Sequence, residues 1–268
     1  MAQNAVAVIA GSAFGANPPE GLVMTPVTID TPWGGVNLHE VQGMGRPAYL
    51  RFRHDLPHNL LPHQIPFRAQ AWAFKEVGCE ALLVTSSVGV LDADVPIFEP
   101  LIIQDLIMLD NRLPNGSTCT MFETPSHDQG HLVVNDGLFS SALNEQLGRM
   151  CQQAGTESPS AVTFAYVAGP RTKTKAENAL WARLGAQVNS MTLAPEIVLA
   201  NELEIPCAGL AVGHKYSVPT MLEPDESTVA ASLVSSRKAM ETIVLTFLRE
   251  AEAVPFGNHI FRFGTSDL

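Results

Sequence analysis

The chain has 268 residues, 46% of them hydrophobic and 16% charged, with a formal net charge of -11 and an isoelectric point near 5.1. This length suits one large α/β domain with a sizeable buried core, and we expect residues 1–268 to form a single domain. Nucleic acid and membrane surfaces are excluded as partners, because binding them needs a basic surface and the chain has no run of lysine or arginine. A small anion needs only a local basic pocket.

The cysteines and the N-terminal segment indicate a cytoplasmic protein. Cys79, Cys119, Cys151 and Cys207 are scattered without a paired metal-binding spacing, so we expect them to be reduced and mostly buried, with no metal site. The apolar run 5–10 lacks a preceding basic region and ends in Gly-Ser, which predicts a strand rather than a signal peptide. No apolar stretch approaches the roughly 20 residues that span a bilayer.

Short runs rich in Val, Ile and Leu alternate with longer segments of helical period. This alternation predicts an α/β fold with a mixed central β-sheet flanked by helices. Trp33-Gly34-Gly35 lies between two of the runs and predicts a hairpin turn. The predicted strands cover residues 6–10, 26–29, 36–41, 48–52, 81–85, 101–106, 162–167, 187–190 and 208–212.

Four helices are predicted from their start and stop signals. They cover residues 67–77, after Pro66 and before Gly78; 173–184, closed by Gly185; 196–202, opened by Pro195; and 226–252, capped by Asp225 or Ser227. The last helix has an apolar stripe, which predicts a face against the core: Val229, Leu233, Met240, Val244, Phe247 and Leu248. The polar segment 113–130 is expected to be a lid or subunit-contact loop, or a disordered excursion.

Polar side chains follow several predicted strands where those strands end. Gly11-Ser12-Ala13-Phe14-Gly15, Arg53-His54, Thr85-Ser86-Ser87-Val88-Gly89 and Met191-Thr192 all occupy such positions. Ligands of open α/β sheets bind beyond the carboxyl ends of strands, and hydroxyls, glycine amides and an arginine are suitable partners for phosphate. Each hydroxyl has the alternative of a turn or capping role, but their coincidence favours an anion site. The glycine segment fits neither the dinucleotide nor the phosphate-loop consensus.

Several motifs occur in the order seen in trimeric purine nucleoside phosphorylases. They are Gly11-Ser12, Thr31-Pro32-Trp33-Gly34, Arg53-His54 with His58, Trp72 to Gly78, Ala168-Gly169-Pro170-Arg171, Leu184-Gly185-Ala186, and Met191-Thr192 to Pro195-Glu196. The chain resembles this family over nearly its whole length and is most similar to the methylthioadenosine phosphorylase branch. The resemblance implies the nucleoside phosphorylase fold and a homotrimer or a dimer of trimers.

The resemblance also implies a reaction and a set of site residues. The reaction is phosphorolysis of an N-glycosidic bond, a step of purine salvage, in which phosphate stabilises and then captures the positive charge at C1′. Inorganic phosphate is the co-substrate, and no metal or other cofactor is implied. Arg53 is expected to be a bidentate clamp in the implied phosphate site, which comprises Ser12, Arg53, His54, Ser86, Ser87 and Thr192.

Three further residues are implied around the sugar. Met191 lies along the ribose face, and His131 matches a histidine that such trimers lend to the neighbouring subunit's sugar site. His58 lines the 5′ side of the sugar, or is a structural histidine beside Pro57.

The base end departs from the family pattern. Thr172 and Lys173 stand where the family has a stacking aromatic residue and a base-reading glutamate. His214-Lys215-Tyr216-Ser217 occupies the strand that carries the family's base-binding aspartate or asparagine, so Lys215, or His214 after a one-residue shift, replaces that group. Either can be cationic and could protonate a leaving base. Lys173 has the alternative of a solvated helix-start lysine beside Lys175.

These departures leave three hypotheses. The first is a phosphorylase whose first candidate substrate is 5′-methylthioadenosine, and the second is an enzyme for a nucleoside with an unusual base or a deoxysugar. The third is a non-catalytic protein that binds a nucleoside or phosphate. A hydrolytic nucleosidase is less favoured, because the Ser12, Arg53, His54 and Thr192 set is suited to phosphate.

Overall fold

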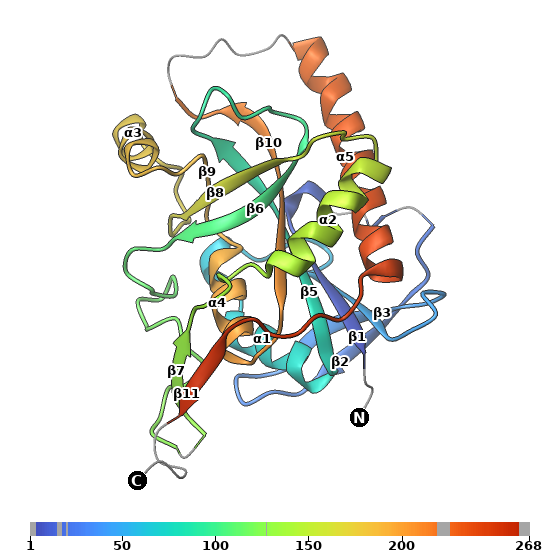
Figure 1. Ribbon diagram of the computed structural model, residues 1–268, viewed down its shortest axis with the longest axis vertical. Helices are drawn as coiled ribbons and strands as arrows, with labels where there is room; N and C mark the ends of the chain where they lie inside the picture. The colour runs from blue at the N-terminus through green and yellow to red at the C-terminus, as the bar shows by residue number, and fades with distance from the viewer. Residues whose placement is uncertain (1–3, 15–17, 20, 127, 219–225, 263–268) are drawn as a thin grey trace.

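The computed structural model describes residues 4–14, 18–19, 21–126, 128–218 and 226–262 (Figure 1). Nine strands form one sheet in the order β10-β6-β8-β9-β5-β1-β4-β3-β2. They are β1 (Ala5–Ala10), β2 (Met24–Ile29), β3 (Val36–Val41), β4 (Ala48–Phe52), β5 (Cys79–Val90), β6 (Pro100–Ile107), β8 (Ser160–Tyr166), β9 (Val188–Ser190) and β10 (Cys207–Tyr216).

Parallel pairing brings several strand ends to one edge. β1 pairs in parallel with β4 and β5, and β5 pairs in parallel with β10. The chain segments that follow β1 and β4 therefore meet beside the second halves of β5 and β10. β10 also pairs with β6, and β6, β8 and β9 lead back to β5, so these five strands form a closed ring.

Helices cover both faces of the sheet, as expected for a mixed α/β fold. One apolar core includes buried residues of α1 (Phe67–Glu76) and α4 (Ala194–Glu202). The other includes buried residues of α2 (Ser141–Gln153) and α5 (Glu226–Glu250). α3 (Lys175–Arg183) lies at the upper left of Figure 1, away from α5 on the right. The predicted fold class is confirmed.

Most predicted elements are present, but a helix and a two-stranded ribbon were not predicted and several elements differ in length from the prediction. The hairpin turn is confirmed, with β2 and β3 antiparallel on either side of Trp33. The prediction missed α2 and the two-stranded ribbon of β7 (Gly130–Val133) and β11 (His259–Arg262). β5 does not end at Thr85 but continues to Val90. α3 begins at Lys175 because the Thr174 side chain accepts a hydrogen bond from the Glu177 N–H and caps the helix.

The stripe of α5 is buried over its second half only. Met240, Val244, Phe247 and Leu248 are buried, whereas Leu233 is 39% exposed, so its predicted place in the core is wrong. The side chain of Val229, together with Asp225 and Gly15, lies outside the described residues. Two short 3-10 helices, η1 (Ser12–Phe14) and η2 (Pro62–Gln64), complete the described elements.

The polar segment after Leu113 is packed onto the body of the protein. Cys119 and Met121 are buried in the core that α1 and α4 share. Arg68 of α1 donates from Nε to the Thr120 carbonyl at 2.7 Å. The alternative of a disordered excursion is therefore wrong for these residues.

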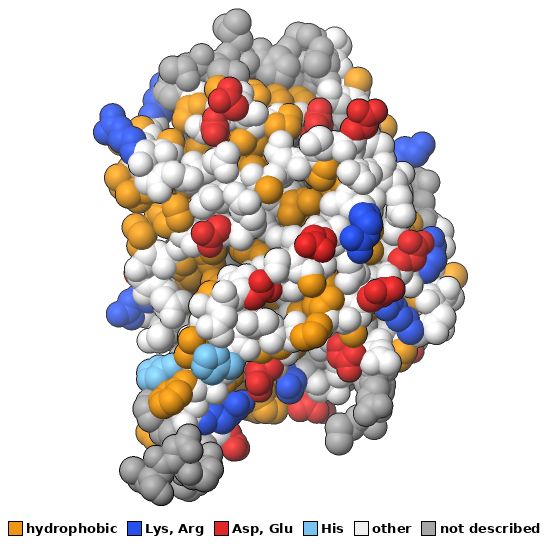
Figure 2. All heavy atoms as spheres, in the orientation of Figure 1, with side chains coloured by type: hydrophobic (Ala, Val, Ile, Leu, Met, Phe, Trp, Pro, Cys, Tyr) orange, Lys and Arg blue, Asp and Glu red, His pale blue; other side chains and the backbone are white. Residues whose placement is uncertain are grey.

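The surface carries no gathered basic patch on the face in Figure 2, where basic and acidic side chains are interspersed. Within the described part of the chain, no helix is long and apolar enough to cross a membrane.

Candidate functional site

Arg53 is the most constrained residue of the predicted phosphate site. It follows β4, is fully buried, and donates from Nη1 to the Thr85 carbonyl of β5 at 2.8 Å. Its Nε contacts the Glu196 carboxylate on α4, and the side chain of Glu196 is also buried. Nη2 is buried without a hydrogen-bond partner among the described atoms. Nη2 and the second N–H of Nη1 are therefore the donors left for a bidentate contact with phosphate.

Glu196 is a residue of this site to which the sequence assigned no role. It lies in the first turn of α4, directly after Pro195 and four residues after Thr192, and its Oε2 has no partner among the described atoms. A buried arginine without a counterion would be very unfavourable, so the Glu196 carboxylate compensates the charge of Arg53 and fixes the direction of its guanidinium. The only signal in the sequence was an acidic residue at the start of an apolar helix.

Gly11 and Thr85 pack against the guanidinium of Arg53. The Gly11 N–H donates to Thr85 Oγ1 at 2.8 Å, and that hydroxyl donates to the Ile9 carbonyl at 3.0 Å. A Cβ on Gly11 would lie 2.6 Å from Arg53 Nη1, so only glycine leaves room for the guanidinium. The Thr85 hydroxyl therefore has the structural role that was the alternative to anion binding.

The remaining hydroxyls of the predicted phosphate site lie on the neighbouring segments. Ser86 is buried and bonds to the Ser190 hydroxyl of β9 at 3.3 Å, two residues before Thr192, which is also buried. Leu193, the residue before α4, has a φ of 77°, which is a strained conformation for a residue with a side chain. Such strain occurs at sites where the surrounding structure fixes the backbone.

His54 and His58 stack on each other. Their ring centroids are 4.4 Å apart with an interplanar angle of 11°. His54 Nδ1 lies 2.7 Å from the Leu60 carbonyl and donates to it, which leaves Nε2 as an acceptor in the neutral ring. Burial lowers the pKa of His54, and this effect outweighs the hydrogen bond to the Leu60 carbonyl, which raises the pKa; the charge of Arg53 lowers it further. The neutral ring can accept a hydrogen bond from a protonated phosphate oxygen.

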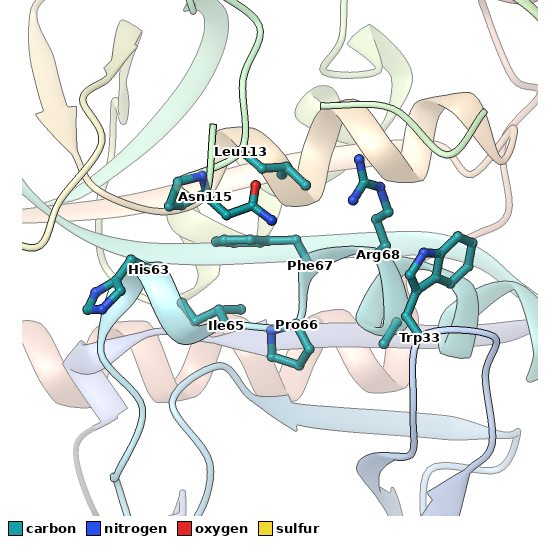
Figure 3. A pocket seen from close by; sticks show the side chains of 10 residues that line it. Trp33, His63, Ile65, Pro66, Phe67, Arg68, Leu113 and Asn115 are labelled. Carbon is teal, nitrogen blue, oxygen red and sulfur yellow. The ribbon is translucent and has the colours of Figure 1, made fainter. Parts of the chain in front are cut away.

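Arg51 and His63, the other basic residues of the loop 51–63, have contacts outside the predicted phosphate site. Arg51 is buried and pairs with Asp55 at 2.5 Å. His63 lines a cavity of about 160 Å³ beside Trp33 and Phe67 (Figure 3). That cavity is smaller than the roughly 300 Å³ at which small-molecule pockets begin.

A larger cavity of about 420 Å³ lies between the strand ends and α5. We call it the α5 cavity. Ser12, Ser87 and His214 line it from the sheet side, so it contains residues from both the predicted phosphate end and the predicted base end. Leu233, Ser236, Arg237 and Met240 line it from α5, beside Val212 of β10. Burial lowers the pKa of His214, and the ring of Phe98 lies 6.0 Å from it.

Lys215 is exposed and does not line the α5 cavity. Burial lowers the pKa of Lys173, and the nearby positive charge of Lys215 lowers that pKa further. Lys173 is half-buried and precedes α3, so the alternative of a solvated lysine at the helix start is not supported. Thr172 is exposed.

The segments that carry Met191 and Ser217 pack closely against two glycines. A Cβ on Gly169 would lie 2.6 Å from Met191 Sδ, and one on Gly89 would lie 2.4 Å from Ser217 Oγ. Asn178 of α3 donates to the Ser217 carbonyl at 3.0 Å and thereby ties α3 to the end of β10.

His131 lies apart from these residues. It is exposed on β7, pairs in register with Phe261 of β11, and lines a separate cavity of about 550 Å³ with Glu202. Figure 1 shows the β7–β11 ribbon at the lower left, far from α3 and the start of α5 at the top. The structure therefore does not bring His131 to the α5 cavity of its own chain.

Sequence comparisons relate this chain to known proteins. Residues 52–249 match the phosphorylase superfamily. A probable 6-oxopurine nucleoside phosphorylase of Thermococcus kodakarensis is 30% identical over 257 residues, 93% of this chain and 92% of that protein. An S-methyl-5′-thioadenosine phosphorylase of Thermofilum pendens is 31% identical over 222 residues, 80% of this chain and 79% of that protein.

Solved structures of the same kind share the fold. A methylthioadenosine phosphorylase from an antarctic soil metagenomic library superposes with a TM-score of 0.74 at 22% identity, over 94% of this chain and 89% of that one. An adenosine/methylthioadenosine phosphorylase mutant of Schistosoma mansoni, solved in complex with methylthioadenosine, gives a TM-score of 0.75 at 21% identity over 93% of both chains.

Proposed function

This chain belongs to the phosphorylase superfamily, and from that membership we propose that it catalyses the phosphorolysis of a purine-type nucleoside to a free base and a sugar 1-phosphate. The family predicted from the sequence motifs is confirmed, and so is the prediction of an enzyme of the nucleoside phosphorylase class. Relatives at 30–31% identity include one named for 6-oxopurine nucleosides and one for S-methyl-5′-thioadenosine.

The observation that carries the proposal is the buried arginine at the strand ends. Arg53 keeps one donor nitrogen, Nη2, without a partner among the described atoms, between the Gly11 turn and the Glu196 carboxylate. Leaving a buried donor unpaired is costly, so it supports a site for an acceptor such as a phosphate oxygen. Ser12, His54, Ser86, Ser87 and Thr192 supply the further hydrogen-bonding groups of the proposed site.

The proposed mechanism places phosphate and base on opposite sides of the sugar. Phosphate approaches C1′ as the glycosidic bond breaks and stabilises the positive charge that develops there. His214 supplies the proton or hydrogen bond to the leaving base, because it shares the α5 cavity with Ser12 and Ser87 while Lys215 does not. No covalent intermediate on the protein is needed, since the protein positions the two reactants.

The first candidate substrate is 5′-methylthioadenosine, with a 6-oxopurine nucleoside as its rival. Lysine side chains only donate hydrogen bonds. The 6-amino group of adenine is also a donor, whereas a 6-oxo group is an acceptor. Lys173, the half-buried lysine at the base end, therefore supports the oxopurine, and a panel of both bases is needed.

The wider assignment is also part of the proposal. We place the whole chain in one domain and the active protein in a homotrimer or a dimer of trimers, in which His131 completes the sugar site of a neighbour. A cytoplasmic location is supported by four cysteines that are all free and buried. Phosphate is proposed as co-substrate without a metal or other cofactor.

Product analysis tests the proposal. The protein is incubated with adenosine, inosine and their 5′-methylthio forms, with and without phosphate, and products are separated and weighed by mass spectrometry. Release of base together with a sugar 1-phosphate, only when phosphate is present, is the expected result. Free sugar without phosphate would indicate a nucleosidase, and saturable binding without any product would indicate the non-catalytic alternative.

A further inference from the structure

The α5 cavity has a chemical character that the proposed reaction does not explain. Its lining includes the Arg237 guanidinium, the His214 ring and the hydroxyls of Ser12, Ser87 and Ser236, and it includes no acidic side chain among the described residues. This is notable in a chain with a formal net charge of -11. A cavity of about 420 Å³ with that lining is large enough for a small organic ligand and suited to an anionic one.

Arg237 is held in place and still able to bind a ligand. Its Nε donates to Glu241 Oε1 one helical turn away at 2.9 Å, and its side chain is 39% exposed. The ion pair engages Nε, so the terminal nitrogens can serve as donors to an acceptor in the cavity. Ser236 donates its hydroxyl proton to the Leu233 carbonyl at 3.1 Å, so Arg237 rather than Ser236 supplies the donors that α5 offers to an anion.

The position of Arg237 indicates which part of a substrate it meets. The cavity joins Ser12 and Ser87, at the proposed phosphate end, to His214, at the proposed base end, so the sugar of a bound nucleoside lies between them. The hydroxyls on the sugar ring stay close to C1′ and the attacking phosphate. The 5′ substituent projects away from the ring, and the wall opposite the strand ends is α5, with apolar Leu233 and Met240 beside Arg237.

We infer that the preferred nucleoside carries an anionic 5′ substituent, and that Arg237 binds its negatively charged end. The inference rests on the proposed function and narrows its substrate class. A carboxylate and a phosphate share the required chemistry: both accept paired hydrogen bonds from a guanidinium. A carboxylate on a short apolar stem would contact Leu233 and Met240 as well, whereas a 5′-phosphate would contact Arg237 alone.

The test compares substrates that differ only at the 5′ position. With saturating phosphate, kcat/KM is measured for inosine, 5′-methylthioinosine, the 5′-carboxylate of inosine and inosine 5′-monophosphate, and for the same set built on adenosine. Four proteins are used: wild type, Arg237→Gln, Arg237→Lys and the matched control Lys238→Gln, which removes an exposed cation next to Arg237 on the same helix.

The expected result is selective. Arg237→Gln should lower kcat/KM for an anionic substrate about 10- to 100-fold, the effect of losing a charge-assisted hydrogen bond, while 5′-methylthio nucleosides change less than about twofold. Arg237→Lys should recover part of the loss, and Lys238→Gln should change nothing. Equal effects of Arg237→Gln on all substrates, or none, would overturn the inference, as would wild-type preference for the neutral 5′ groups.

A binding measurement separates this inference from the proposed reaction. If no nucleoside is cleaved, the proposed function fails, and calorimetric titration of the 5′-carboxylate and 5′-monophosphate nucleosides into wild type and Arg237→Gln still tests Arg237. Weaker binding to Arg237→Gln than to Lys238→Gln would support the site without catalysis. Equal affinity, or no binding to wild type, would overturn it.

Discussion

The phosphate end and the base end of the candidate site are built in different ways. At the phosphate end, Arg53, Thr85 and Glu196 come from three separate elements and are buried in mutual contact. At the base end, Thr172 and Lys215 are exposed, and the nearby ion pair of Arg171 with Glu177 joins residues only six apart. Changes at the first end therefore disturb the core, whereas changes at the second end leave the fold intact. The departures from the family pattern, Thr172, Lys173 and Lys215, fall at this second end.

Removing Glu196 should have the largest effect. Glu196→Ala leaves the buried Arg53 without its counterion, and we expect the free energy of unfolding to fall by about 3–5 kcal/mol. Urea denaturation measures the change. The control is Glu204→Ala, which breaks the exposed pair with Arg262 and should cost under about 1 kcal/mol. If both variants lost similar amounts of unfolding free energy, the buried ion pair of Arg53 would contribute no more to stability than the exposed pair of Arg262.

Loss of the proton donor should come next. His214→Gln is expected to lower kcat/KM about 100-fold, equivalent to about 2.7 kcal/mol, if His214 assists the leaving base. Burial lowers the pKa of His214, so the wild-type rate should rise as pH falls from 8 to 6, and this rise should disappear in the variant. Lys215→Gln is the matched control on the adjacent residue. A large loss in Lys215→Gln alone would transfer the role to Lys215.

A methyl group at Gly11 should have an intermediate effect. In Gly11→Ala the new Cβ would meet Arg53 Nη1 at 2.6 Å and the Thr85 carbonyl at 2.7 Å, so the guanidinium must move. We expect a loss of about 1–3 kcal/mol in unfolding free energy and a raised KM for phosphate. Gly148→Ala on α2 is the control, because its Cβ would meet only Ile102 Cδ1 at 3.9 Å. Its stability should change by no more than about 1 kcal/mol.

The smallest effect should be the pH dependence contributed by His54. Burial holds the pKa of His54 below its usual 6.5, so the folded protein binds this proton less readily than the unfolded chain. The contribution to stability is complete above about pH 6.5 and is lost as pH falls through the lowered pKa, with a slope of at most about 1.4 kcal/mol per pH unit.

His54→Gln should reduce this slope below pH 6.5 and leave a constant difference from wild type above pH 7.5. Urea denaturation at several pH values measures both. An unchanged slope would show that His54 titrates alike in the folded and unfolded states.

Local signals in the sequence were reliable where their cause is local. The period of Phe67–Glu76, the glycine after the helix and the turn at Trp33 each depend on neighbouring residues, and each element was predicted. The ribbon of β7 and β11 was missed because it pairs His131 with Phe261, and neither strand has an alternating apolar pattern that would mark it alone.

The sequence by itself determined the mixed α/β class, most of the strands and helices, the family, and the set of polar residues that follow the strands. Only the tertiary structure decided what each of them contacts. In the folded chain Arg53 pairs with Glu196, 143 residues later, and the Thr85 hydroxyl donates to a backbone carbonyl. His214, rather than Lys215, lines the α5 cavity. The physical reason is that an element forms from its own period and caps, whereas hydrogen bonds and charge pairs between elements depend on how distant segments pack.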